Sequence, residues 1–246
     1  MQDFERYQSF ARTAFGFEFN DPQLLVTAFT HRSYVNEHRS TTKEHNERLE
    51  FLGDAVLELI VTEFLFAKYK DPEGVLTSWR SALVRTESIG QAAERLGFSE
   101  VLRMSKGERR AGSERAREQM LANSFEAVVG AIYLDQGYEV TKKFIEDNII
   151  ITFDEILRTG SWRDSKSLLQ EIAQSTEGVT PSYRLLSEDG PDHDKIFTIG
   201  AFVGKNLRGK GSGSSKQAAQ QQAAENALHF YAHSRESHQH DGDSKK

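Results

Sequence analysis

The sequence predicts two domains, an all-α domain followed by a smaller α+β domain with the element order α-β-β-β-α. Three observations lead to this prediction. Apolar side chains recur at helical spacing from residue 4 to residue 157. After residue 164 the pattern changes to short apolar runs separated by turn-forming residues. A chain of 246 residues is also long enough for two modest domains.

The first helices are indicated by apolar stripes and by a proline. Apolar residues on one face predict a helix over residues 3–15. Pro22 suits the first turn of a second helix, which is predicted to begin at Asp21 and to run into His31 and Tyr34. His31 could be a ligand or a base, but a lone histidine at a helix end is more often a hydrogen-bonded structural residue, and we expect that role. Residues 36–45 are polar and predict a loop.

The next segment, residues 46–61, predicts a long amphipathic helix. Its buried stripe is expected to contain Leu49, Leu52, Val56, Leu59 and Ile60. Glu47, Glu50, Asp54 and Glu58 lie along another stripe, since an α-helix turns by roughly 100° per residue.

Carboxylates this close repel one another unless a positive charge lies among them. One interpretation of the stripe is a solvated acidic face. The other is a site for a divalent cation such as Mg²⁺, because hard cations bind carboxylate oxygens. Geometry alone does not say which of these carboxylates take part in chemistry.

The rest of the all-α domain contains a turn, four further predicted helices and a basic segment. The turn is Asp-Pro-Glu-Gly at residues 71–74. The helices are predicted over residues 78–83 and 88–96, from residue 120 to a C-cap at Gly137, and over residues 138–157. Residues 105–117 predict a mobile basic loop, and Arg115 and Arg117 within it are well placed to meet phosphates. A solvated charged loop is the alternative.

The second domain is predicted over residues 164–232, after a linker at residues 158–163. Its elements are a helix at 166–172, strands at 181–186, 196–203 and 206–211, and an Ala/Gln-rich helix at 214–230. Residues 233–246 are polar and predict a disordered tail.

Composition limits the class of protein. There is no cysteine, so disulfides and thiolate zinc sites are excluded. We expect a cytoplasmic protein, because no signal peptide is recognised and the longest apolar run, residues 55–61, is too short for a membrane span and is broken by Glu58. The net charge of −6 argues against a nucleic-acid binder, although clustered carboxylates lower the total without lining the surface that would bind a nucleic acid.

The sequence Asn-Glu-Arg-Leu-Glu-Phe-Leu-Gly-Asp at residues 46–54 resembles the signature of ribonuclease III, the bacterial double-stranded-RNA endonuclease. The resemblance implies that this helix supplies carboxylates for Mg²⁺, for which Mn²⁺ can substitute. Residues 120–130 resemble the second acidic helix of that family. Glu126 matches the principal catalytic glutamate, whereas Asn123 stands where the usual residue is aspartate.

The resemblance therefore implies a set of site residues. We expect Glu50, Asp54, Asn123 and Glu126 as metal ligands, with Asp54 and Glu126 as the catalytic pair, and Glu47 and Glu73 as supporting acids. Glu73 is equally compatible with a solvated turn glutamate. Phe51 is a candidate for packing in a homodimer, which the family forms, although a core position is equally compatible.

The implied activity is hydrolysis of double-stranded RNA to 5′-phosphate and 3′-hydroxyl ends with a two-nucleotide 3′ overhang, in rRNA and mRNA processing. Because an amide brings no charge to a metal site, Asn123 leaves a second hypothesis open: a catalytically impaired protein that binds double-stranded RNA without cutting it.

The α-β-β-β-α order and the turn Gly-Pro-Asp-His at residues 190–193 resemble the double-stranded-RNA-binding domain. Such domains read the shape of A-form RNA across its minor grooves and phosphates. Gln170, Glu171 and His193 match positions that reach 2′-hydroxyl groups. Lys210 and Lys216 lie near the start of the last helix, where backbone amides also favour phosphate.

Overall fold

The computed structural model describes residues 2–111, 113–162, 164–191 and 195–240. The chain divides into two compact units, Met1–Trp162 and Arg163–Lys246. The order of elements is that of an all-α domain followed by an α-β-β-β-α domain, which confirms the predicted fold class. Across these described ranges, no helix is both long enough and apolar enough to span a membrane.

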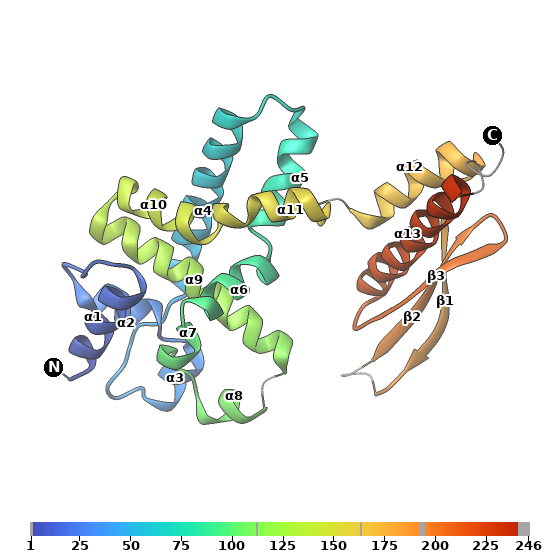
Figure 1. The fold of residues 1–246 in the computed structure, drawn as a ribbon. Helices are drawn as coiled ribbons and strands as arrows, with labels where there is room; N and C mark the ends of the chain where they lie inside the picture. Colours follow the sequence, from blue (N-terminus) through green and yellow to red (C-terminus); the bar gives the residue numbers. More distant parts are fainter. Residues whose placement is uncertain (1, 112, 163, 192–194, 241–246) are drawn as a thin grey trace. The chain divides into compact units, whose positions relative to one another are not determined.

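The first unit is organised around two long helices that pack against each other, α4 (Glu47–Lys68) and α9 (Glu114–Gln136) (Figure 1). Helix α9 is buried around most of its circumference, as expected of a helix surrounded by others. The remaining helical elements are α1 (Gln2–Ala14), α2 (Pro22–Ala28), α3 (Arg32–Glu37), α5 (Glu73–Leu83), α6 (Thr86–Arg95), α7 (Phe98–Val101), α8 (Lys106–Ala111), α10 (Tyr138–Asn148), the 3₁₀ turn η1 (Ile150–Thr152) and α11 (Phe153–Thr159).

An aromatic cluster connects α9 to the surrounding helices. Phe29, Phe98 and Phe125 are completely buried. The ring centroids of Phe29 and Phe98 lie 4.8 Å apart, and those of Phe98 and Phe125 lie 6.0 Å apart. Large buried rings supply much of the stability of a core, so this cluster fixes the position of α9.

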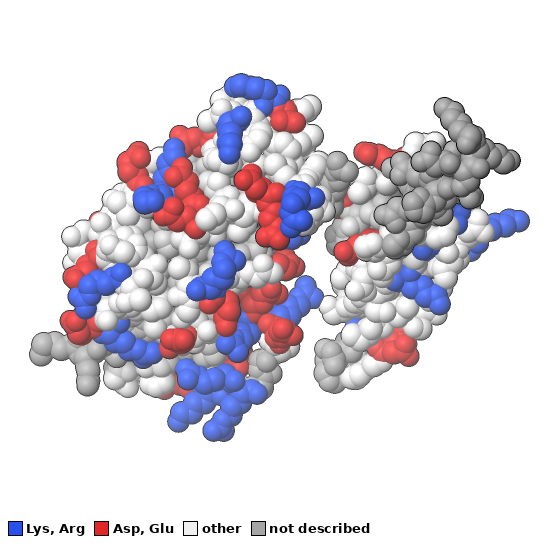
Figure 2. Space-filling view, in the orientation of Figure 1, with Lys and Arg blue, Asp and Glu red and all other residues white. Residues whose placement is uncertain are grey.

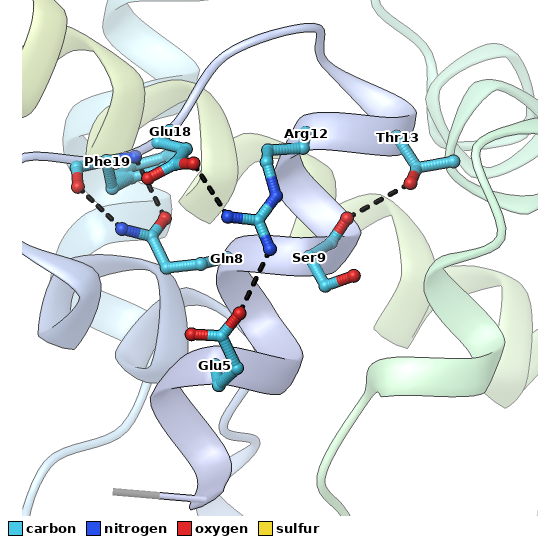
Figure 3. A network of polar contacts seen from close by, with 7 residues as sticks. All are labelled: Glu5, Gln8, Ser9, Arg12, Thr13, Glu18 and Phe19. Carbon is cyan, nitrogen blue, oxygen red and sulfur yellow. Dashed lines mark hydrogen bonds and ion pairs between the residues drawn. The ribbon is translucent and has the colours of Figure 1, made fainter.

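Polar contacts at the surface hold α1 to the segment that follows it (Figure 3). The guanidinium of Arg12 donates to Glu5 Oε1 at 3.0 Å and to Glu18 Oε1 at 2.7 Å. The side-chain amide of Gln8 donates to the carbonyl oxygen of Phe19 and accepts from its N–H. Exposed ion pairs stabilise little, so the buried apolar face of α1 contributes most of its stability.

The helix predicted from Asp21 into Tyr34 is two helices, α2 and α3, so the prediction of one continuous helix is wrong. Between them Thr30 forms an isolated parallel bridge with Arg103, which extends the backbone. His31 caps α3, because its Nδ1 accepts a hydrogen bond from the backbone N–H two residues later. The expected structural role of His31 is confirmed, and burial lowers its pKa.

Two other predicted elements differ from the structure. The basic segment at residues 105–117 contains α8 and the first turn of α9, so it is not simply a loop. The side chain of Ser105 accepts the N–H of Glu108 and starts α8. The single helix predicted at residues 138–157 is divided into α10, η1 and α11.

The second unit is a three-stranded antiparallel sheet in the order β1-β2-β3, with both helices on one face (Figure 1). Its elements are α12 (Ser165–Glu177), β1 (Ser182–Asp189), β2 (Ile196–Val203), β3 (Asn206–Gly213) and α13 (Lys216–His240). A Cβ atom at Gly209 or Gly211 would overlap the backbone of α13. The facing residues of α13 are buried alanines, Ala219, Ala223 and Ala227. Small residues on both elements therefore allow α13 to lie close against β3.

The ends of two helices differ from the predicted domain boundaries. Helix α11 extends to Thr159, into the predicted linker at residues 158–163. The backbone of α13 is helical as far as His240, beyond His233, where the sequence predicts the start of a disordered tail. Residues 241–246 lie outside the described residues.

Candidate active site

Two glycines allow the backbones of α4 and α9 to touch where these helices cross. A Cβ atom at Gly53 would overlap the backbone carbonyl oxygen of Glu126, and a Cβ atom at Gly130 would overlap a carbonyl oxygen of α4. Glu50 and Asp54 lie three residues before and one residue after Gly53, so the crossing brings both carboxylates near Glu126. Acids from two separate helices therefore lie near one another at this crossing.

Burial and neighbouring negative charges raise the pKa of Glu126 and of Glu50 at this crossing. Burial is the largest cause for Glu126, whose pKa rises to about 8, and the charges of Asp54 and Glu50 follow. Burial also raises the pKa of Glu50, and the charges of Glu47 and Asp54 add to it. A divalent cation would relieve this repulsion, and carboxylate oxygens are the ligands that Mg²⁺ prefers. The charge and chemistry of these residues therefore fit a magnesium ion.

Among the residues that the structure describes, no three His, Asp or Glu side chains are already arranged to hold a metal ion. Like-charged carboxylates that lie close together repel one another. After burial, this repulsion is the next cause that raises the pKa of Glu50 and of Glu126.

Asn123, the remaining predicted ligand, is held by two hydrogen bonds. Its side-chain oxygen accepts from Nε2 of Gln119, one turn earlier on α9, at 2.7 Å. Its amide also hydrogen-bonds to the carboxylate of Glu50, an interaction that lowers the pKa of Glu50 and partly offsets the raising effects. The oxygen of Asn123 is therefore engaged away from the Glu50 carboxylate.

The other predicted acids have different surroundings. Glu47 forms an ion pair with Arg32 at 2.9 Å, although it is close enough to raise the pKa of Glu50. Glu58 pairs with Arg80 at 3.1 Å. Glu73 begins α5, where it accepts a hydrogen bond from the Thr77 hydroxyl at 3.0 Å. It lines a groove of about 460 Å³ between α4 and α5 rather than the crossing of α4 and α9.

Basic residues of the first unit gather around α3 and α8. Figure 2 shows Lys and Arg side chains clustered on the surface in that region. The exposed basic residues in and beside these helices include Arg32, Arg39, Lys43, Lys106, Arg109 and Arg110. The two arginines singled out from the sequence are on α9: Arg117 pairs with Glu94 at 3.6 Å, and Arg115 lines a polar pocket together with Gln119.

In the second unit, most residues expected to meet RNA lie on the surface. Gln170, Glu171 and Lys210 are exposed. Lys216 is the first residue of α13, as predicted, and its Nζ lies 3.4 Å from a carboxylate oxygen of Glu188. His193 lies outside the described residues.

An exposed apolar stripe runs along α4. Phe51, Leu59 and Phe66 are 82%, 58% and 72% exposed. The prediction that Leu59 is buried is therefore wrong, and Phe51 is not a core residue. Phe66 also lines the groove that contains Glu73, so the stripe continues into that groove. Large exposed apolar side chains in a row are typical of a protein interface.

Two features of this site were not predicted from the sequence. Gln119 was not recognised because glutamine in an exposed helix is ordinary, and only the departure at Asn123, four residues later, hints at it. The crossing glycines were also missed, although Gly53 and Gly130 each lie a few residues from the acids, within helical patterns where glycine is otherwise unfavourable.

Both units of the chain are similar to known proteins. The family model described as "Ribonuclease-III-like" matches residues 21–153, and the model for the double-stranded RNA binding motif matches residues 165–231. Ribonuclease 3 of Streptococcus gordonii is 48% identical over 221 residues, which cover 89% of this chain and 94% of that protein. Ribonuclease 3 of Enterococcus faecalis is 46% identical over 87% of this chain and 93% of its own length. The chain belongs to the ribonuclease III family.

A solved structure supports the same assignment for the first unit. The nuclease domain of ribonuclease III from Campylobacter jejuni is 39% identical, with a TM-score of 0.50, and it covers 56% of this chain and 96% of that one. Its description refers to a region involved in dimer formation. Both parts of the predicted resemblance, the ribonuclease III domain and the double-stranded RNA binding motif, are confirmed.

Proposed function

We propose that this member of the ribonuclease III family is a Mg²⁺-dependent endoribonuclease that hydrolyses double-stranded RNA. The observation that supports this proposal most directly is the meeting of Glu50 and Asp54 with Glu126 at the crossing of α4 and α9. Gly53 and Gly130 allow the two helices to approach closely, and acids held this close without a cation raise the free energy of the fold. Such an arrangement is best explained by a bound divalent ion.

In this proposal Glu50, Asp54 and Glu126 hold Mg²⁺, and Mn²⁺ can substitute for it. The ion would supply an activated water, relief of phosphate charge and support for the leaving 3′-oxygen. The half-buried position of Glu126 excludes much of the water around its carboxylate, which strengthens its interaction with a cation. The products are 5′-phosphate and 3′-hydroxyl ends with a two-nucleotide 3′ overhang, and the substrates include rRNA and mRNA precursors.

The second unit docks the RNA. Gln170 and Glu171 on α12 and Lys216 at the start of α13 face solvent, with Lys210 on the strand that precedes α13. Backbone amides at the start of a helix and adjacent lysines favour phosphate, whereas the polar side chains of α12 suit 2′-hydroxyl groups. Lys216 must leave Glu188 to bind a phosphate, so we expect binding to weaken steeply with added salt.

The first unit forms a homodimer through the apolar stripe of α4 in this proposal. Replacing Phe51 with aspartate places a charge in the middle of the buried interface and is expected to give monomers. Light scattering during gel filtration measures this as a halved mass. Ile151→Asp is the matched control, since Ile151 is 71% exposed and belongs to η1 rather than to the apolar stripe of α4, so the mass should stay unchanged. A dimeric Phe51→Asp protein would contradict this interface.

The cleavage activity is tested on long double-stranded RNA, with Mg²⁺ or Mn²⁺ titrated. We expect cutting by the unsubstituted chain, and Asn123→Asp should lower the metal concentration for half-maximal rate by about 10-fold, because a carboxylate adds a negative charge to the site. Gel analysis of the product ends and overhang checks the products.

The rival candidate is a protein that binds double-stranded RNA without cutting it. It is favoured by the neutral side chain of Asn123, whose oxygen is engaged by Gln119. Retained RNA binding with no cutting at any metal concentration, and cutting gained by Asn123→Asp, would establish this candidate and refute the nuclease proposal.

A further inference from the structure

Three side chains form a hydrogen-bonded row from the surface of α9 to the acidic site. Gln119 is exposed, and its Nε2 donates to Oδ1 of Asn123 at 2.7 Å. Asn123 is half-buried, and its side chain hydrogen-bonds to the carboxylate of Glu50 on α4. The row therefore joins the two helices that carry the acids.

The chemistry of each group sets the direction of the row. An ionised carboxylate only accepts hydrogen bonds, so Asn123 must present its NH₂ group to Glu50. Its oxygen then points the opposite way, where it needs a donor, and Gln119 supplies one. Turning the amide of Asn123 to offer its oxygen to a cation beside Glu50 would lose both bonds and place two NH₂ groups face to face.

We propose that Gln119 is a positioning residue of the metal site, which fixes the amide of Asn123 so that Asn123 orients Glu50 and is not itself a ligand. This inference rests on the proposed function, because it assumes a cation held by Glu50, Asp54 and Glu126. Hydrogen-bond partners of ligating carboxylates orient them, and their removal weakens metal binding. In this chain Asn123 and Gln119 would together support metal binding through hydrogen bonds that orient Glu50. A carboxylate at position 123 would support it through its negative charge.

The test measures Mn²⁺ affinity by calorimetry on the full chain without RNA, so that it does not depend on cleavage. Asn123→Ala should weaken Mn²⁺ binding by about 10-fold or more, the usual effect of losing such a partner. Gln119→Ala should weaken it by about 3- to 10-fold, although the hydrogen bond that Gln119 donates goes to Asn123 and not to a carboxylate. In the Asn123→Ala background, Gln119→Ala should have no further effect, because it acts through Asn123.

Gln91→Ala, at another exposed helical glutamine of the first unit, is the control and should leave Mn²⁺ affinity within about 2-fold. Thermal unfolding of each variant checks that the fold is intact. A Gln119→Ala affinity within about 2-fold of the unsubstituted chain overturns the inference, as does an equal effect with and without Asn123. No Mn²⁺ binding by the unsubstituted chain, or full binding by Glu126→Gln, would overturn the proposed function and this inference with it.

Discussion

Gly53→Ala is expected to disrupt the first unit, with a loss of about 3 kcal/mol or more in the free energy of unfolding. The added methyl group would overlap the carbonyl oxygen of Glu126, a backbone atom that cannot rotate away. Helices α4 and α9 would have to separate along a buried contact. The higher helix propensity of alanine, about 1 kcal/mol, offsets only part of this cost. Separation also moves Glu126 away from Glu50 and Asp54, so cleavage should fall by at least about 100-fold.

Gly74→Ala is the matched control for this prediction. Gly74 is also helical, on α5, but a Cβ atom there has open space around it. This variant should be neutral or more stable by up to about 1 kcal/mol. Thermal and urea unfolding measure both variants, and Gly130→Ala should repeat the loss seen for Gly53→Ala. If Gly53→Ala and Gly74→Ala had equal stability and activity, the close crossing of α4 and α9 would be refuted.

Glu126→Gln is expected to lower the rate of RNA cleavage on the order of 10³-fold or more while leaving RNA affinity nearly unchanged. The amide keeps the size of the side chain but removes the negative charge that the cation requires. RNA binding should persist because the residues proposed to dock RNA belong to the second unit. Single-turnover cleavage and a filter-binding assay separate the two effects.

The same substitution should stabilise the metal-free protein at alkaline pH. The pKa of Glu126 is about 8 in the folded chain and about 4.5 when unfolded, so between these values the folded state binds more protons. The contribution of Glu126 to the free energy of unfolding therefore falls as pH rises from about 4.5 to 8. Above pH 8 Glu126 is charged in both the folded and the unfolded chain, and this loss of stability is complete. After discounting for partial exposure, Glu126→Gln should gain about 1 to 3 kcal/mol at pH 8.5 in EDTA and little at pH 4.

Glu58→Gln serves as the control for both measurements, the rate of RNA cleavage and the stability of the metal-free protein. Glu58 lies on α4 along the same predicted acidic stripe, but it pairs with Arg80 at the surface. Its replacement should change stability by less than about 1 kcal/mol and leave cleavage within a few-fold. A Glu126→Gln protein that cleaves as fast as the Glu58→Gln protein would remove Glu126 from the site.

The sequence alone predicted those features of the fold that depend on residues close together in the chain. Apolar spacing predicted α1 and α4, and the resemblance predicted α9. Local chemistry predicted two helix ends, the start of α2 at Asp21 and Pro22 and the C-cap at Gly137. The change to strand patterns after residue 164 predicted the second unit. The resemblance on residues 46–54 and 120–130 identified the acids and the departure at Asn123.

Tertiary contacts determine which of these acids lie beside Glu126. Four acids share a stripe of α4, yet Arg80 pairs with Glu58, Arg32 pairs with Glu47, and only Glu50 and Asp54 remain directed at Glu126. The burial that raises the pKa of Glu126 comes from helices far away in the sequence.

Helical periodicity determined by itself which residues of a helical segment share a face, because this follows from the geometry of a single turn. It did not determine what packs against each face. The break between α2 and α3 depends on the bridge between Thr30 and Arg103, and the exposure of Leu59 and Phe51 depends on which side of α4 the other helices cover. Only the folded chain sets these, since they are contacts between residues distant in sequence.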